Sequence, residues 1–209
     1  MKNSKFIVIE GGEGSGKSTL INLMKEEFGD KFIYTREPGG SILSEAIREI
    51  ALTHPEAKLA SPETQFALMW AGRHDNINKT VIPALKQGKN VLCDRFDSAT
   101  YAYQIFGMEA KHLEKLFWQI RSIFLRDKKP DLYIILDVEP EEGLRRVALR
   151  KGKTNHFDEK TIDFHKRIRK GLFKFKKFVK NCIVIDANQS LEDVKREFIN
   201  IIKQKCKNL

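Results

Sequence analysis

Residues 11 to 19 read GGEGSGKST, and the run follows an apolar stretch at residues 6–9. It matches the pattern G-x-x-x-x-G-K-[ST] at four positions: Gly11, Gly16, Lys17 and Ser18. Glycines permit backbone angles at which successive N–H groups point at phosphate oxygens, the lysine adds a mobile charge, and the serine hydroxyl can ligate Mg²⁺. The context predicts strand, phosphate-binding loop and a helix over 17–27 whose N-terminus favours an anion. The alternative is a glycine-rich turn that binds nothing.

Short apolar runs alternate with helical patterns along the 209 residues. Strands are predicted at residues 6–9, 32–35, 90–93, 132–137 and 182–186. The last helix is marked by Leu191, Val194 and Phe198 on one face, with Ser190 as its N-cap. Five strands separated by helices predict a five-stranded parallel sheet flanked by helices on both faces, in a three-layer α/β domain over 1–209. Ligands bind such sheets at the carboxyl ends of the strands.

The net charge of +10 admits two interpretations. Lysine and arginine could neutralise a nucleic-acid backbone, or they could serve anionic nucleotides and solubility. Much of the excess lies between 145 and 180, where apolar residues recur every three or four positions, for example Phe164, Ile168 and Leu172. That spacing predicts a helix with an apolar face toward the core and lysines toward water. Nucleic acid is therefore not the expected partner.

No apolar run approaches the roughly 18 residues that a membrane-spanning helix needs, and no secretory signal is recognisable at the N-terminus. Cys93, Cys182 and Cys206 lie far apart without a C-x-x-C pair. Three separated cysteines without such a pair predict reduced thiols and a cytoplasmic protein. Cys93 and Cys182 are expected at strand positions in the core.

A second group of candidates follows the later strands. Asp94 ends a strand beside the phosphate loop, where a Mg²⁺ ligand is expected, and Arg95 offers a planar fork for another phosphate. Adjacent strand residues point to opposite faces, so the two should do different work. Arg36 and Arg48 follow the second strand and the turn after it. The alternative for Asp94 and Arg95 is a surface ion pair.

A helix over 62–82 should present Phe66, Met69 or Trp70, and Arg73 on one face, because these residues stand three, four or seven positions apart. An apolar surface beside an arginine suits a flat base that needs stacking and a hydrogen-bond donor. The alternative is that these residues are an ordinary stripe of the apolar core.

Residues 145–158 begin as a helix and become glycine-interrupted and basic, which suggests a mobile lid. The alternative is an ordinary exposed loop.

Taken in order, the motifs resemble those of bacterial thymidylate kinases, within the phosphate-loop nucleoside monophosphate kinases, over nearly the whole chain. The landmarks are FIVIEGGEGSGKST, TREPGG, WAGR, VLCDRFDSATYAYQ, KPDLYIILDVEPEEGLRR and VIDANQSLEDV. The resemblance implies transfer of the ATP γ-phosphoryl group to dTMP, giving dTDP and ADP, with Mg²⁺ as cofactor. It also implies a homodimer. No general base is needed, since the attacking phosphate oxygen is already anionic.

The resemblance also implies site residues. ATP would be bound by Gly11, Gly12, Glu13, Gly14, Ser15, Gly16, Lys17, Ser18, Thr19 and Asn188, with Ser18 and Asp94 near Mg²⁺. The dTMP site would comprise Glu13, Arg48, Met69, Arg73, Arg95, Thr100 and Tyr103. Lys17, Arg95, Arg146 and Arg150 would act in catalysis. The two lid arginines are chosen because the loop position that is basic in some members is Gly14 here.

Three departures from the family pattern bear on specificity. Met69 stands where Phe usually stacks on the base, Ala99 replaces a common serine, and residues 155–158 read Asn, His, Phe, Asp instead of Asp-Arg, an apolar residue and Glu. A thioether defines a ring plane less firmly than an aromatic ring. Alternatives are therefore a deoxynucleoside monophosphate kinase of different or broader base choice, and a nucleotide-binding regulator without activity.

Overall fold

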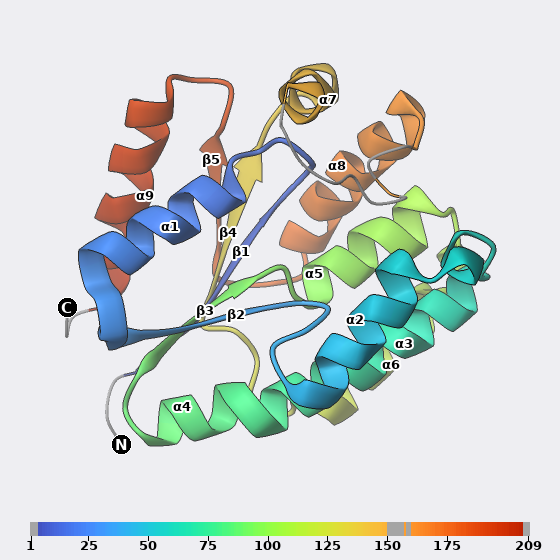
Figure 1. Cartoon of the computed structure of the whole chain (residues 1–209), viewed down its shortest axis with the longest axis horizontal. Coiled ribbons are helices and arrows are strands. Elements are labelled where there is room, and N and C mark those ends of the chain that lie inside the picture. Colours follow the sequence, from blue (N-terminus) through green and yellow to red (C-terminus); the bar gives the residue numbers. More distant parts are fainter. Residues whose placement is uncertain (1–3, 150–156, 158–159, 207–209) are drawn as a thin grey trace.

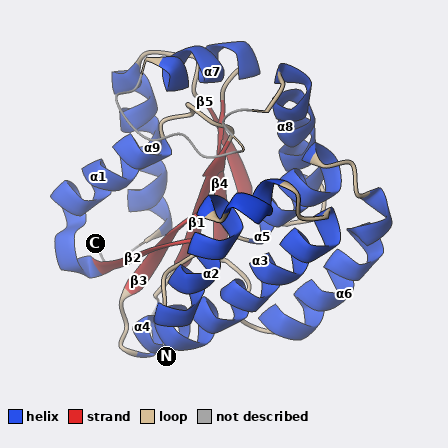
Figure 2. Ribbon diagram, turned by 45° about the vertical axis from the view of Figure 1, so that its right-hand side comes forward, coloured by secondary structure: helices blue, strands red, loops and turns tan. Residues whose placement is uncertain are grey.

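The computed structural model describes residues 4–149, 157 and 160–206. Its centre is a five-stranded parallel sheet in the order β2-β3-β1-β4-β5. The strands are β1 (Phe6–Gly11), β2 (Phe32–Arg36), β3 (Asn90–Asp94), β4 (Leu132–Asp137) and β5 (Cys182–Asp186). All five predicted strands are confirmed, and β1, β2 and β3 run one or two residues beyond the predicted ends. The predicted three-layer architecture is confirmed as well (Figures 1 and 2).

Helices α1 (Lys17–Phe28) and α9 (Leu191–Lys205) cover one face of the sheet (Figure 1). Apolar side chains from both helices pack there against Ile7, Ile9 and Ile134. The Ser190 side chain accepts a hydrogen bond from the Asp193 N–H, so the predicted N-cap of α9 is confirmed. Because α1 begins at Lys17, its packing on this face also positions the phosphate loop that precedes it.

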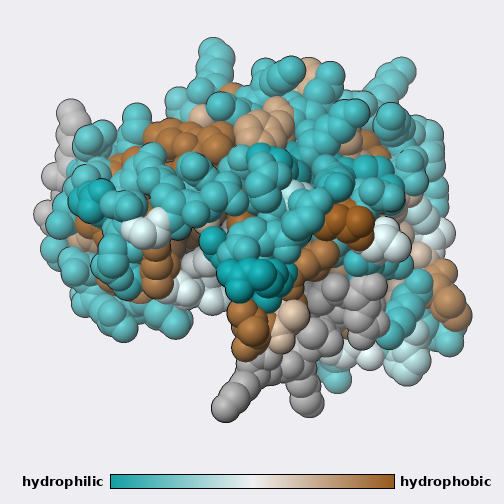
Figure 3. Space-filling view, turned by 90° about the horizontal axis from the view of Figure 1, so that it is seen from above, coloured by the Kyte–Doolittle hydropathy of each residue, from teal (hydrophilic) through white to brown (hydrophobic). Residues whose placement is uncertain are grey.

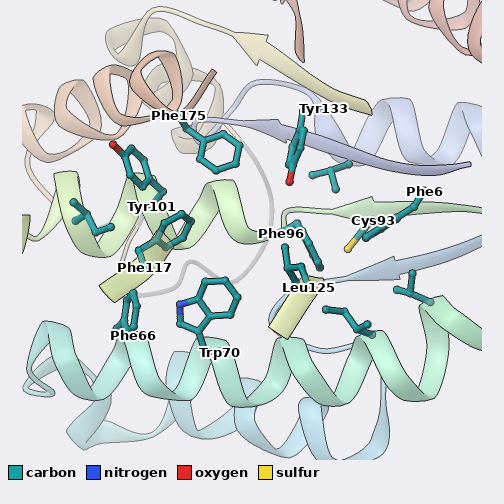
Figure 4. Close-up of a cluster of buried hydrophobic side chains, with 14 of the residues drawn as sticks. Phe6, Phe66, Trp70, Cys93, Phe96, Tyr101, Phe117, Leu125, Tyr133 and Phe175 are labelled. Carbon is teal, nitrogen blue, oxygen red and sulfur yellow. The ribbon is translucent and has the colours of Figure 1, made fainter. Parts of the chain in front are cut away.

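The opposite face is covered by a larger group of helices (Figure 1). They are α3 (Pro62–Asn76), α4 (Ile82–Lys86), α5 (Asp97–Thr100), α6 (Glu114–Leu125) and α8 (Ile162–Lys176), while α2 (Ile42–Thr53) packs on α3. Figure 4 shows aromatic rings converging on this side of the sheet, among them Trp70, Phe117 and Phe175 of these helices and Tyr101, which follows α5. Cys93 is buried in this cluster, and the partly buried Cys182 packs against it, as predicted for both thiols.

The helix predicted over 62–82 is not a uniform α-helix. It is α-helical to Asn76, π-helical over Ile77–Val81 and α-helical again in α4. Pro83 has no N–H to continue the α-helical bonding pattern, which gives a physical reason for the wider turn before it. A second π-helical stretch, Tyr101–Gly107, continues α5.

A buried polar network fixes α5 against the sheet. Asp97 at its start pairs with Arg121 of α6 at 2.5 Å and accepts the Tyr133 hydroxyl of β4 at 2.7 Å. The Asp97 side chain is completely buried, so both of its partners are needed to offset the cost of removing its charge from water. The network therefore sets the position of the chain that follows α5, including Thr100 and Tyr103.

Helix α7 (Pro140–Ala148) follows β4 at the carboxyl edge of the sheet (Figure 1). The predicted lid does begin as a helix, but Arg150, Asn155 and His156 lie outside the described residues. In the described part of the chain, none of the helices combines the length and apolar character needed to cross a bilayer.

Candidate active site at the carboxyl edge of the sheet

A cavity of about 820 Å³ opens at the carboxyl ends of the strands. Residues 13–19 of the phosphate loop and of α1 line one part of it. Its other predicted lining residues are Arg48, Met69, Arg73, Asp94, Arg95, Thr100, Tyr103 and Arg146. Figure 3 views the molecule from above, with mixed polar and apolar surface around the described part of this edge. One cavity thus brings together residues that lie far apart in the sequence.

The phosphate loop has the backbone that its glycines predict. Gly14 and Gly16 both have positive φ, 71° and 94°, which a side chain would disfavour. The Lys17 ammonium folds back on the loop and donates to the Gly11 and Gly12 carbonyls at 3.0 and 3.1 Å. Burial and the neighbouring Arg95 lower the pKa of Lys17. These hydrogen bonds keep the Lys17 ammonium group beside the main chain of the phosphate loop.

Arg95 connects the phosphate loop to the end of β3. Its φ is 65°, so the chain turns sharply after Asp94 and the guanidinium reaches back over the loop. It donates to the Gly11 carbonyl at 3.0 Å and to Glu13 at 2.7 Å, and it lies 4.9 Å from the centre of the Tyr103 ring. Asp94, the preceding residue, lines the same cavity, so the different roles expected of the two residues remain a prediction.

Glu13 accepts a second bond, from the Tyr103 hydroxyl at 2.7 Å. Burial would raise the pKa of this carboxyl, but Arg95 and Lys17 outweigh burial and lower the pKa to about 2. A fixed anion therefore sits in the middle of the cavity, between the phosphate loop and the ring of Tyr103.

Arg73 is 2% exposed and forms part of the cavity wall. Its Nε pairs with Glu37 at 2.8 Å, and its Nη2 donates to the Phe96 carbonyl and the Thr100 hydroxyl at 2.8 and 3.0 Å. Its Nη1 has no hydrogen-bond partner among the described residues. A buried donor without a partner costs free energy, so a ligand oxygen near Nη1 would be bound favourably.

Met69 and Trp70 share the face of α3 predicted for them, but they differ in role. Met69 lines the cavity, whereas Trp70 packs in the aromatic cluster and lies 4.6 Å from the Arg73 guanidinium. Helical spacing alone left either residue open and the family resemblance named Met69, which is the one of the two that lines the cavity. Arg48 also lines the cavity and donates to the Pro38 carbonyl at 2.8 Å.

Arg146 of α7 reaches the same edge. Its Nη1 donates to the Ala187 carbonyl at 2.9 Å and lies 3.5 Å from the Gly14 carbonyl, while its Nε pairs with Glu142 at 2.7 Å. Arg145 also pairs with Glu142 and lines the cavity. Arg145 was not predicted, although its position beside Arg146 on a basic helix was a signal for it.

Of the predicted residues that the structure describes, three do not line the cavity: Gly11, Gly12 and Asn188. The carbonyls of Gly11 and Gly12 hold Lys17 from below. Asn188 accepts the Glu139 N–H and donates to Asp186, so it joins the ends of β4 and β5, while Ala187 and Gln189 on either side of it line the cavity.

Sequence reasoning missed Gln104, which is buried and lines the cavity. Its amide nitrogen lies 3.5 Å from the Gln65 side-chain oxygen. Helical spacing places it near Thr100, four positions earlier, and that signal could have found it. Phe157, an apolar residue of the predicted lid, also lines the cavity, with its ring 5.3 Å from Tyr103.

Comparison with known proteins agrees with this arrangement. A family model described as thymidylate kinase matches residues 9–198. The chain is 39% identical to a thymidylate kinase of Caulobacter vibrioides, covering 98% of this chain and 99% of that one, and 35% identical to that of Clostridium novyi, covering 97% and 100%. The crystal structure of thymidylate kinase from Ehrlichia chaffeensis superposes with a TM-score of 0.72 at 30% identity, covering 96% of this chain and 98% of that one.

Proposed function

The chain belongs to the thymidylate kinase family and is an ATP-dependent phosphotransferase that converts dTMP to dTDP, and on this premise we propose which of its residues carry out each part of the transfer. The observation that carries the proposal is the single cavity that the phosphate loop and three arginines, Arg48, Arg73 and Arg95, line together. One part suits the ATP phosphates and the other suits a nucleoside monophosphate.

ATP occupies the part of the cavity formed by the phosphate loop. Main-chain amides of residues 13–19 receive its phosphates, Lys17 provides the charge near the transferred group, and Ala187 and Gln189 lie toward the adenine. Asn188 contributes by holding the β5 loop in place through Glu139 and Asp186.

The acceptor dTMP occupies the other part. Arg48 and Arg95 bind its phosphate, Tyr103 packs against the deoxyribose, and Met69 lies along the base. The unpaired Arg73 Nη1 and the Gln104 amide read the polar edge of the base, with Thr100 fixing Arg73 through its hydroxyl. Glu13 lies between the two nucleotides and near the sugar.

Ser18 and Asp94 are the residues that would hold Mg²⁺, which neutralises phosphate charge when it is bound. One oxygen of Asp94, Oδ1, is buried and has no hydrogen-bond partner among the described residues, so an acceptor is available at the cavity wall. The donor set of a carboxylate and a hydroxyl fits a hard cation that also takes phosphate oxygens.

The protein aligns two anionic groups and supplies cations to the developing charge. Lys17, Arg95 and Arg146 are the described cations of the cavity to which we assign this role, and Arg150, outside the described residues, completes the set. An arginine at such a position lowers the barrier by on the order of several kcal/mol. The proposal includes a single domain with a lid over 145–158 and a cytoplasmic location.

A homodimer is also part of the proposal. Helices α2, α3 and α6 form adjacent rows on one side of the molecule in both ribbon views (Figures 1 and 2). Several large apolar side chains of α2 and α6 are exposed: Ile42, Leu43, Ile50, Leu116 and Ile123. An exposed apolar surface of this kind is typical of a contact between protein chains.

The experiment that tests the acceptor is a panel of monophosphates with ATP and Mg²⁺. We expect dTMP to be the preferred acceptor, with kcat/KM well above those for dCMP, dGMP and dAMP. Preference for another monophosphate would contradict the assignment of the base-reading residues, and Met69→Phe would then test whether the thioether is the cause.

A further inference from the structure

A completely buried carboxyl group, that of Glu10, lies beneath the acceptor part of the cavity. Glu10 is in the central strand β1, and its side chain follows the alternation of Phe6 and Val8 toward the aromatic cluster. It is 0% exposed and is not among the cavity-lining residues. An apolar residue would be expected at such a position, so the charge needs an explanation.

Hydrogen bonds do not stabilise this carboxyl. Neither of its oxygens has a hydrogen-bond partner among the described residues. The Ser98 hydroxyl of α5 is near enough to lower the pKa of Glu10 somewhat but is not in hydrogen-bonding geometry. Burial nevertheless raises the pKa of Glu10 to about 7, although Arg95 and Lys17 limit the rise. Folding a carboxyl into such surroundings costs stability.

Its ion-pair partner is Arg95, with Nη1 lying 3.6 Å from Oε1 of Glu10. Arg95 therefore has a carboxyl on either side: Glu13 at 2.7 Å, which lines the cavity, and Glu10, which does not. An acceptor phosphate entering the cavity competes with Glu13 for Arg95, because both anions need the same guanidinium. It cannot reach Glu10, which the sheet encloses.

We propose that Glu10 is a positioning residue that holds Arg95 in its binding geometry when the acceptor phosphate takes the place of Glu13. Glu10 provides a carboxyl partner on the inner side of the guanidinium that no ligand can displace, and Glu13 provides an exchangeable one on the outer side. This inference rests on the proposed role of Arg95 in binding the acceptor phosphate. It gives a reason for a buried charge that contributes nothing to the apolar core.

The test measures KM and kcat for each nucleotide, together with calorimetric dTMP affinity, in Glu10→Gln, Arg95→Lys and the double variant. Glu10→Gln keeps the shape and removes the charge. We expect its dTMP affinity to fall roughly tenfold or more, because Arg95 loses its fixed partner, while KM for ATP stays within about twofold. Thermal stability should be unchanged or higher, since an unsatisfied buried carboxyl has been removed.

The double variant separates positioning from a general structural effect. In the Arg95→Lys background, Glu10→Gln should change dTMP affinity by less than about twofold, because the group it positions is no longer there. Equal losses in both backgrounds, or wild-type dTMP affinity in Glu10→Gln, would overturn the inference. If Arg95→Lys alone left dTMP affinity unchanged, the proposed role of Arg95 would fail first, so the two failures are distinguishable.

Two more variants complete the design. Glu114→Gln removes a carboxylate that accepts the Tyr101 hydroxyl outside the cavity, and it should behave as wild type. If Glu10→Gln does not fold, Glu10→Asp takes its place in the experiment. That variant keeps the carboxyl group but shortens the side chain by one methylene group, so the carboxyl lies farther from Arg95. An intermediate loss of dTMP affinity in Glu10→Asp supports the inference, and wild-type affinity in that variant overturns it.

Discussion

The carbonyl oxygen of Gly143, on α7, lies only 2.1 Å from the place that a β-carbon on Gly14 would occupy. In return, a β-carbon on Gly143 would lie 2.3 Å from the Glu13 carbonyl oxygen. The obstructing atoms are backbone, which cannot move aside as the end of a flexible side chain can. The phosphate loop and α7 are thus fitted together through two glycines, and there is no room for a side chain on Gly14.

Gly143→Ala should therefore distort the phosphate loop. We expect KM for ATP to rise, and the free energy of unfolding to fall by about 1–3 kcal/mol, because the new methyl group overpacks a rigid contact. Thermal denaturation and ATP titration measure both effects. Glu141→Ala, on the exposed side of the same helix, is the control and should change neither quantity. Wild-type values in Gly143→Ala would show that the contact is not tight.

Lys17→Ala should lose turnover by on the order of 100-fold or more, since the charge beside the transferred phosphoryl group is removed. The fold should persist, which far-ultraviolet circular dichroism would verify, because the lysine bonds only to the loop itself among the described residues. Lys25→Ala, an exposed change on the same helix, serves as the control. An unmodified rate of dTMP phosphorylation in Lys17→Ala would refute the assignment.

The depressed pKa of Glu13 has a consequence for acid stability. Its pKa is about 2 in the folded protein against 4.5 for an unperturbed glutamate, so the unfolded chain takes up the proton first as pH falls. The stabilisation is complete above about pH 4.5 and is lost as pH falls toward 2, with an upper limit of about 3 kcal/mol. In Glu13→Gln, the free energy of unfolding should depend less on pH between about pH 4.5 and pH 2, as measured by denaturant titration at each pH without nucleotide. The same pH dependence of the unfolding free energy in the wild type and in Glu13→Gln would contradict the lowered pKa of Glu13.

The exposed face of α2 and α6 leads to a prediction about assembly. Ile123 is 60% exposed on α6, and Ile123→Lys places a charge where the proposed dimer contact would bury it. Sedimentation should report a dimer for the wild type and a monomer for the variant. Leu149→Lys is the matched control, since Leu149 is 72% exposed and follows α7, and so belongs to neither α2 nor α6. A dimeric Ile123→Lys protein would exclude this face as the contact.

Strand positions and the phosphate loop could be predicted because their signals are local. The five apolar runs and the spacing of Gly11, Gly16 and Lys17 depend on neighbours in sequence, and β1 to β5 lie where these patterns placed them. Arg95 could be assigned to the site because parallel strands end at one edge. Its left-handed backbone, which brings it back over Glu13, could not be predicted.

The sequence by itself determined the sheet, the loop and the residue types gathered at its carboxyl edge, because periodicity and glycine spacing act over a few residues. Helical spacing could not decide between Met69 and Trp70, and only the tertiary structure decided that Gln104 joins the cavity and that Glu10 lies beneath Arg95. Those outcomes depend on how α3, α5 and β1 pack against one another. Side-chain packing between segments distant in sequence leaves no periodic signal in any one of them.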